Sequence, residues 1–370
     1  MTKFAKISLV AAVAVAGLTT ANAQPLEEAI KGVDVSGMVR YRFETLDGYS
    51  LSKALPGTEA AKSNLNNYRI DIKTSANVND MVKANVLAGT VYTTVQNGTG
   101  ADIYTNSADI NAGLEVKEAN FAINALGATI IAGKQSIPGP FVDNTVDQWS
   151  KGSGVVALVP VAGVTLAAGT FNNTNIADGL DASEFAIIGN VAGISADVWY
   201  ANLGAAGKNA VSVHANGAVA GVAVDARYTS KDNKLEEKDK ATLTKIVAST
   251  KISTIDVAAG YVKTGKDNSV TNNVSIDGDN DAAVDAKIWQ ASMGIVADSS
   301  AWLVSAGTSI AGIGAKLTYI DVESGNATET LLDVSYPVSK NFTLASKYSV
   351  MTVDTLPDST KTRIEAKYTF

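Results

Sequence analysis

The chain ends in Lys361-Thr-Arg-Ile-Glu-Ala-Lys-Tyr-Thr-Phe370, a stretch in which two kinds of side chain alternate at every position. One side of this stretch carries Lys361, Arg363, Glu365, Lys367 and Thr369, and the other carries Thr362, Ile364, Ala366, Tyr368 and Phe370. A period of two residues with one charged and one apolar face predicts an amphipathic β-strand. A water-soluble β-sandwich can also end on such a strand, so the strand alone leaves two fold classes open.

The first residues of the chain have the pattern of an export signal. Residues 1–23 begin with Lys3 and Lys6, continue with an apolar stretch from Ile7 to Leu18, and end in Ala21-Asn22-Ala23. This pattern predicts a secretory signal peptide that is cleaved after residue 23. The apolar stretch is shorter than the roughly 20 residues that span a bilayer. We therefore expect the mature protein to comprise residues 24–370 as one domain outside the cytoplasm.

The apolar residues are dispersed along the chain. Hydrophobic residues make up 46% of the sequence and charged residues 18%, yet no later apolar run is long enough for a membrane helix. Dispersed apolar residues are typical of a transmembrane β-barrel, in which alternate side chains face lipid and a wet lumen. The final Phe370 of an amphipathic strand also resembles the end of Gram-negative outer-membrane barrels, whose assembly machinery reads a terminal Phe. Aromatic residues, at 6%, are few for full aromatic girdles, so aliphatic residues must cover much of the lipid face.

The composition also argues against several classes of function. The chain has no cysteine, which excludes a disulfide framework and a thiolate metal site. His214 is the single histidine, and no nucleophile with a neighbouring base is visible, so we expect the protein not to be an enzyme. A net charge of −7 argues against nucleic acid as a partner.

Short and long connections alternate between the amphipathic stretches from residue 33 onward. The short ones are rich in small residues: Asn77-Val-Asn-Asp80, Leu126-Gly127, Val161-Ala-Gly163, Val191-Ala-Gly193, Val219-Ala-Gly221, Ile310-Ala-Gly312 and Ser339-Lys-Asn341. The long ones are polar and lie at 47–64, 96–112, 136–152, 172–182, 231–239 and from 265 onward. This alternation is typical of outer-membrane barrels, which place short turns in the periplasm and long loops outside. The repeated Val-Ala-Gly could instead mark a β-solenoid, but its uneven spacing makes that reading weaker.

The number of strands follows from a parity argument. About 19 stretches have strand patterning, whereas bacterial single-chain barrels close with even numbers. If Ile310-Ala-Gly312 is a periplasmic turn, residues 266–297 form one long excursion outside, and the piece 282–296 is part of it, for instance as a short helix in the barrel mouth. About 18 strands remain, at 33–46, 66–77, 82–95, 113–125, 127–135, 153–160, 163–171, 183–192, 193–203, 209–219, 220–230, 240–252, 254–264, 298–309, 311–321, 328–338, 341–353 and 360–370.

Basic residues gather on one face of the strands that close the barrel. Closure sets the last strand beside the first, which predicts a basic wall of the lumen formed by Arg40, Arg42, Arg69, Lys73, Arg363 and Lys367. Facing lipid would cost about 2 to 4 kcal/mol for each such residue near the membrane centre. We interpret them as one side of a transverse field across a constriction. The alternative is a set of solvated polar-face residues with mixed partners such as Glu44, Asp71 and Glu365.

The opposite, negative side of the constriction should come from a loop folded into the pore. Residues 136–152 are the best candidate because two prolines fix a bend, Asp143 and Asp147 supply charge, and Trp149 supplies a packing anchor. Oxygen ligands from Asp143, Asp147, Asp178 or Asp285 could also hold a hard cation such as Ca²⁺. No spacing matches an EF-hand, and Asp277-Gly-Asp-Asn-Asp281 is better explained as a solvated turn.

Two stretches resemble a known family. Gln24-Pro-Leu-Glu-Glu-Ala-Ile-Lys-Gly-Val-Asp-Val-Ser-Gly-Met-Val-Arg-Tyr-Arg42 is similar to the amino terminus of the major outer-membrane porins of Campylobacter and related epsilonproteobacteria. Ile131-Ala-Gly-Lys-Gln135, followed by Asp143-Asn-Thr-Val-Asp147, resembles that family's strand leading into its constriction loop. The resemblance implies an 18-stranded homotrimeric porin with calcium near the constriction in some members. Asp147 matches the motif, Asp178 corresponds more loosely, and Asp285 lies where no family pattern is recognisable.

These observations predict an all-β transmembrane barrel in the cell outer membrane, surrounded by lipid and lipopolysaccharide. The expected function is general diffusion of small hydrophilic solutes and ions, weakly cation-selective as the resemblance implies, with no required cofactor and with Ca²⁺ as an optional ligand. Two alternatives remain: a structural or adhesion barrel that is plugged and binds a partner through the loops near 47–64 and 265–297, and a substrate-specific channel for anions or short oligomers.

Overall fold

A computed structural model describes most of the chain. The described residues are 32–48, 61–90, 94–96, 102–104, 113–143, 150–176, 179, 181–204, 208–233, 239–269, 272–276, 282–324, 326–354 and 356–370. Their strands and connections account for the barrel, its turns and most of the segments inside it.

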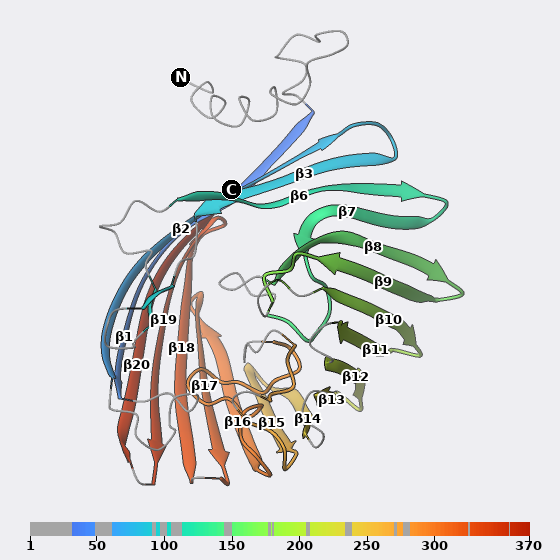
Figure 1. Cartoon of the computed structure of the whole chain (residues 1–370). Coiled ribbons are helices and arrows are strands. Elements are labelled where there is room, and N and C mark those ends of the chain that lie inside the picture. Colours follow the sequence, from blue (N-terminus) through green and yellow to red (C-terminus); the bar gives the residue numbers. More distant parts are fainter. Residues whose placement is uncertain are drawn as a thin grey trace, which may run out of the picture.

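The described strands form one antiparallel sheet of 18 strands that closes on itself (Figure 1). Each strand pairs with its neighbour along the chain, and the last strand pairs with the first. A separate two-stranded hairpin, β4 (Thr94–Gln96) with β5 (Asp102–Tyr104), lies within the connection between β3 and β6. The predicted fold class, a barrel of about 18 antiparallel strands, is therefore confirmed.

The barrel strands are 9 to 17 residues long, and a tilted strand needs about 9 to 11 residues to cross a bilayer. Their bounds are β1 Val33–Gly48, β2 Ala61–Asn77, β3 Val82–Thr90, β6 Leu114–Ala125, β7 Ala128–Ser136, β8 Lys151–Val161, β9 Val164–Asn172, β10 Ala182–Val191, β11 Ile194–Leu203, β12 Lys208–Val219, β13 Val222–Asn233, β14 Asp239–Ile252, β15 Ile255–Thr264, β16 Ser300–Ile310, β17 Ile313–Val322, β18 Ala327–Ser339, β19 Phe342–Val353 and β20 Leu356–Thr369. The stretch 153–160, which looks short in the sequence, is the middle of the longer β8.

Five of the short connections, 126–127, 162–163, 192–193, 220–221 and 311–312, are two-residue hairpin turns with left-handed backbone at both residues. Between β8 and β9, Val161 pairs with Val164, while Ala162 and Gly163 have φ values of 49° and 87°. Positive φ at both central residues is the signature of a type I′ turn, whose twist matches that of the flanking strands. Glycine adopts this conformation readily, which explains why it recurs as the second residue of these turns.

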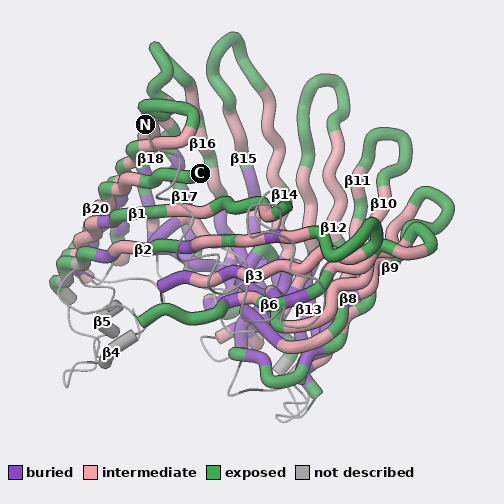
Figure 2. The backbone as a smooth tube through the Cα atoms, turned by 90° about the horizontal axis from the view of Figure 1, so that it is seen from above, coloured by how far each residue is buried: buried purple, intermediate pink, exposed green. Residues whose placement is uncertain are grey.

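Burial follows the alternation along the strands and also differs between the two ends of the barrel. On β1, Arg40 and Arg42 are buried, whereas Val39 and Tyr41 are exposed on the outer face. Buried inner-face residues concentrate near the long connections, while the two-residue turns and adjoining strand ends are mostly exposed (Figure 2). The lumen is therefore filled by other parts of the chain mainly at its long-loop end.

The connection between β15 and β16 contains no strand of the barrel, as the parity argument predicts. Its described residues, 265–269, 272–276 and 282–299, form turns, bends and one isolated bridge between Lys287 and Ser292 rather than a helix. Figure 1 shows this segment inside the barrel. No helix among the described residues is long and apolar enough to cross a membrane.

The carboxyl terminus seals the barrel against the first strand. The backbone N–H of Gly37 donates to the Phe370 carbonyl at 2.9 Å, and the Phe370 N–H donates to the Gly37 carbonyl at 3.1 Å. A Cβ on Gly37 would lie 2.6 Å from the Phe370 ring and 2.5 Å from the Asp71 carbonyl oxygen. Glycine at position 37 thus leaves the space that the terminal ring occupies.

We expect Gly37→Val to weaken this seal by about 1 to 3 kcal/mol, because the added atoms must displace the ring and the neighbouring strand. Heat-modified migration on SDS gels reports the temperature at which the folded barrel opens, and this temperature should fall. Gly204→Val is the matched control, because no atom lies within 4 Å of a Cβ there. Equal opening temperatures for the two variants would contradict the proposed packing role.

Candidate functional site

The predicted basic residues lie on the inner face of three adjacent strands. Pairing sets Arg40 of β1 directly opposite Arg69 of β2 on one side and Lys367 of β20 on the other. Arg40, Arg42 and Arg69 are each buried, whereas Lys73 and Lys367 are exposed and Arg363 is partly exposed. The structure therefore brings all six predicted residues to one curved section of the inner wall.

Carboxylates are interleaved with these cations. Arg42 donates from Nε and Nη2 to a single oxygen of Glu365 at 2.9 and 2.7 Å. Glu44 accepts from Arg363 at 2.6 Å and pairs with Lys361 at 3.0 Å. The wall is therefore a network of mixed charge, and its excess of cations is smaller than the count of arginines and lysines suggests.

A β-bulge adds Lys117 to the wall. The pairing of β3 with β6 slips between Leu87 and Ala88, which lie opposite Glu118 and Val116, so Lys117 is the extra residue. A bulge re-aims a side chain by breaking the alternation of a strand. Lys117 is accordingly buried, while the next residue, Glu118, makes inner-face contacts of its own.

Asp71 joins Lys117 to the arginine cluster. Its carboxylate accepts from Arg69 Nε at 2.6 Å and from Lys117 Nζ at 2.7 Å. A Cβ on Gly89 would lie only 2.0 Å from Asp71 Oδ1. Because Gly89 has no Cβ, the Asp71 carboxylate has room to lie between the two cations.

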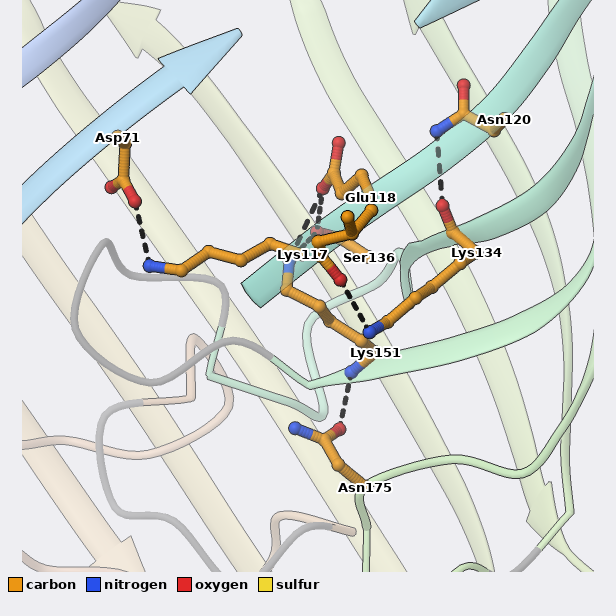
Figure 3. Close-up of polar contacts among 9 residues, drawn as sticks. Asp71, Lys117, Glu118, Asn120, Lys134, Ser136, Lys151 and Asn175 are labelled. Carbon is orange, nitrogen blue, oxygen red and sulfur yellow. Dashed lines mark hydrogen bonds and ion pairs between the residues drawn. The ribbon is translucent and has the colours of Figure 1, made fainter. Parts of the chain in front are cut away.

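Lys151 extends the wall onto β8 (Figure 3). Its ammonium lies 3.4 Å from Glu118 Oε1 and 3.4 Å from the Ser136 hydroxyl, and Ser136 donates to the same Glu118 oxygen at 2.7 Å. The Lys151 backbone N–H donates to Asn175 Oδ1 at 2.6 Å. Lys117 and Lys151 are not among the predicted residues, because neither the bulge in β6 nor the true start of β8 leaves a clear mark in the period of two.

The described part of the predicted constriction loop contacts the opposite inner wall. A Cβ on Gly139 would lie 3.0 Å from the Trp199 ring and 3.1 Å from Glu184 Oε2, and both side chains face inward from β11 and β10. Asp143, one of the predicted acidic residues, is buried. Asp147 and Trp149 lie outside the described residues, so the constriction itself stays a prediction.

The loop between β15 and β16 packs against this segment. The Ile276 N–H donates to the Phe141 carbonyl at 2.9 Å, and the Val284 N–H donates to the Pro140 carbonyl at 3.0 Å. Apolar residues of both segments share one buried cluster with inner-face residues of the barrel. The members of this cluster that come from these two segments are Ile137, Phe141, Val142, Val274, Ile276, Ala282, Val284, Ala286, Ala291 and Met293.

The Asp285 carboxylate accepts hydrogen bonds from residues of its own loop. It is buried, and it accepts from the Ser292 hydroxyl at 2.7 Å and from the N–H groups of Ala286 and Gly294 at 2.6 Å each. Burial raises the pKa of the Asp285 carboxyl, although these hydrogen bonds act in the opposite direction. Among the described residues no cluster of acidic or histidine side chains could hold a metal ion, and Asp147 and Asp178 lie outside those residues. The predicted calcium ligands stay a prediction.

His214 lies on the inner face, in a second cluster of charges. Its Nδ1 is 2.7 Å from Asp197 and its Nε2 is 2.8 Å from Asp225. Arg227 Nη1 on β13 lies 3.9 Å from Asp197 Oδ1 on β11, across the intervening β12. The histidine is therefore part of a polar network across β11, β12 and β13.

A cavity of about 220 Å³ opens beside the basic wall. Its charged lining residues are Arg42, Lys347, Arg363 and Glu365, and Ala345 and Ser346 complete it. Each of its three cations is paired with a carboxylate, Arg42 with Glu365, Arg363 with Glu44 and Lys347 with Asp333, so the positive charge of the cavity is largely balanced. A small anion that enters it would meet guanidinium and ammonium N–H groups.

Comparisons with known proteins agree with this architecture. The sequence model of the family described as Campylobacter major outer membrane protein matches residues 2–226, which is more than half of the chain. No curated protein matches the chain. Several solved structures are similar in fold. Acinetobacter baumannii OccAB4 has 13% identity and a TM-score of 0.68, covering 91% of this chain and 98% of that one. Pseudomonas aeruginosa OccK5 (OpdH) has 12% identity and a TM-score of 0.70, with 92% and 98% covered. Pseudomonas aeruginosa OccK3 (OpdO) has 14% identity and a TM-score of 0.69, with 93% and 97% covered.

We expect Asp71→Asn to destabilise the barrel by on the order of 3 kcal/mol, because Arg69 and Lys117 lose the carboxylate that lies between them in a buried site. The temperature of heat-modified migration should fall. Asp34→Asn is the matched control, since Asp34 is highly exposed and pairs with Lys83 at 3.5 Å. A stability loss no larger than that of the control would show that the Asp71 pair is not needed.

The raised pKa of Asp285 predicts a pH dependence of loop opening. A group whose pKa is raised on folding stabilises the folded form below its ordinary pKa, and this contribution is lost as pH rises through the raised value. We therefore compare the hydrogen-exchange rates of residues 282–296 in the natural chain and in Asp285→Asn. The ratio of the natural chain's rate to the variant's rate should increase as the pH is raised. Asp298→Asn, at an exposed residue paired with Lys263, should leave the comparison flat. A constant ratio for Asp285→Asn would contradict this.

Proposed function

Because the chain belongs to the Campylobacter major outer membrane protein family and is an outer-membrane channel, we propose that it is a general diffusion porin for small hydrophilic solutes and ions. This family and fold are those of membrane channels rather than enzymes. The cell outer membrane is accordingly its location.

One observation carries the proposal: the closed barrel has an apolar outer face and a charged, polar inner face. Exposed outward residues such as Val39, Tyr41 and Ile364 alternate with inward Arg40, Arg42 and Arg363. A barrel of 16 to 18 strands is wide enough for an aqueous channel. Burial of the inner face is limited mainly to the long-loop end, which is consistent with a wide entrance at the turn end.

We place the proposed constriction between the basic wall and the inward loops. On one side lie the strands from β20 through β8, with their interleaved cations and carboxylates. On the other side lie residues 137–143 and the loop between β15 and β16. Passing solutes would experience a transverse field at this level. Pairing of the wall cations with carboxylates, together with the net charge of −7, supports weak preference for cations.

A substrate-specific anion channel is the second candidate. The cavity beside Arg42, Lys347 and Arg363 favours it, because such a site could hold a carboxylate or phosphate group during passage. A structural or adhesion role with a plugged barrel is a further alternative. Assembly into a homotrimer within lipid and lipopolysaccharide, with Ca²⁺ near the constriction, is part of the porin proposal.

Planar-bilayer recording of the purified protein separates these functions. A general porin gives conductance steps that rise linearly with salt concentration, and the reversal potential in a salt gradient shows the preference for cations. An anion-specific channel gives conductance that saturates and is blocked by a small carboxylate. The absence of conductance steps would overturn both channel proposals in favour of the structural role.

Replacing Arg40 and Arg42 together with Ala should shift the reversal potential further toward cation selectivity. Removing positive charge from a low-dielectric constriction changes the local potential that passing ions meet. Lys62→Ala is the control, because Lys62 is on the outer face of β2 and its side chain is highly exposed. An unchanged reversal potential in the double variant would mean that the two arginines do not face the ion path.

A further inference from the structure

The loop between β15 and β16 lies inside the barrel, and hydrogen bonds attach it to the wall at several points along its length. Near its start, Lys231 of β13 donates to the Ser275 carbonyl at 2.7 Å. In its middle, Lys245 of β14 donates to the carbonyls of Ala283 and Asp285 at 3.3 and 2.9 Å. These contacts attach the loop to one part of the wall.

A single carboxylate of β18 holds the far part of the loop. Glu329 is fully buried, and it accepts from three consecutive backbone N–H groups of the loop. The distances are 3.3 Å from Trp289, 3.0 and 3.1 Å from Gln290, and 2.8 Å from Ala291. Consecutive N–H groups that converge on one anion form a nest, and hydrogen bonds to an ionised acceptor are the strong ones.

Neighbouring strands complete the attachment. Ser349 of β19 donates to Glu329 Oε1 at 2.7 Å and accepts from Gln290 Nε2 at 2.8 Å. Ser359 of β20 donates to Gln290 Oε1 at 2.9 Å. Beside them, Lys361 Nζ and the Arg363 guanidinium lie 4.7 and 5.2 Å from the centre of the Trp289 ring. Residues 289–291 of the loop therefore lie against the basic wall.

The position of this loop bears directly on the width of the lumen. The loop is bonded to Pro140 and Phe141 of the other inward segment, so the two segments form one body inside the barrel. The contacts described above reach from β13 to β20. The polar atoms of the Glu329 side chain bond to this body and to Ser349, so its carboxylate is not required for strand pairing.

We propose that Glu329 is a positioning residue of the channel, which sets the pore width by holding residues 289–291 against β18, β19 and β20. This inference rests on the proposed diffusion function and adds a second inward loop, with its anchor, to the predicted constriction. Loss of the carboxylate leaves three loop N–H groups without their acceptor and frees this part of the loop to move across the lumen.

The first test compares Glu329→Ala with Asp333→Ala. Asp333 lies four residues further along β18 on the same face and pairs with Lys347 of β19 at 3.0 Å. We expect single-channel conductance of Glu329→Ala to change by roughly twofold, since conductance of an aqueous pore follows its open cross-section. The size limit for sugars in liposome swelling should change in the same direction. Glu329→Gln should fall between, because its amide keeps one acceptor oxygen.

A merely structural role would lower the opening temperature of the barrel without changing conductance or the size limit. That result, or equal channel properties for Glu329→Ala and Asp333→Ala, would overturn the proposal. If Glu329→Ala fails to assemble, Gln290→Ala leaves the strands unaltered and removes the side-chain bonds from the loop to Ser349 and Ser359. It keeps the backbone bonds to Glu329, so a smaller change of conductance and size limit in the same direction is expected, and unchanged channel properties would overturn the proposal.

A thiol probe tests the anchor independently of conductance. The chain has no cysteine, and Ala291 is buried, so Ala291→Cys introduces one hidden thiol. We expect a water-soluble maleimide to label this thiol slowly in the otherwise natural chain and much faster when Glu329→Ala is added. If Glu329→Ala speeds labelling but the natural chain shows no conductance, the anchor is supported and the diffusion function is overturned. Equally slow labelling in both proteins would overturn the anchor whatever the conductance.

Discussion

Pairing of every strand's backbone groups is the constraint on which the rest of this structure depends. The hydrocarbon of a membrane offers no hydrogen-bond partner, so a sheet can cross it only when no strand edge remains open. Here β1 pairs with β2 on one side and β20 on the other, and the terminal Phe370 exchanges hydrogen bonds with Gly37 at the seam. Closure then decides the direction of each side chain, because alternate residues must face lipid and lumen.

The same reasoning applies to charges inside the barrel. Buried ions are costly unless they are paired, and at the basic wall carboxylates lie between cations, as Asp71 lies between Arg69 and Lys117. The inward loops are held differently. Backbone N–H groups of the β15–β16 loop donate to Glu329, and its carbonyls accept from the ammonium groups of Lys231 and Lys245. Apolar side chains of both inward segments pack in one core with the wall. Electrostatics and apolar packing thus hold these two segments inside the barrel, at the end where the long connections lie.

Much of the barrel could be predicted because its pattern is local. The period of two, the small-residue turns and the parity of strands led to the correct count and to the correct removal of residues 282–296 from the sheet. The alternation also indicated the inward direction of Arg40, Arg69 and Arg363. Lys117 could not be found in this way, since a bulge breaks the very period used to find the strands. Lys151 could not be predicted because Gly-Ser-Gly follows it, and these small residues lack the apolar–polar alternation that indicates a strand.

The sequence by itself determined the class of fold, the face on which each regular strand residue lies and the alternation of turns with loops, since these depend on neighbours a few positions apart. Tertiary structure alone decided which distant residues meet. Glu329 reads as one more polar residue of an amphipathic strand, and only closure of the barrel places it within reach of Gln290 and Ala291. Contacts of this kind depend on the path of a long loop through the lumen, which is set by packing over the whole wall and leaves no period in the chain.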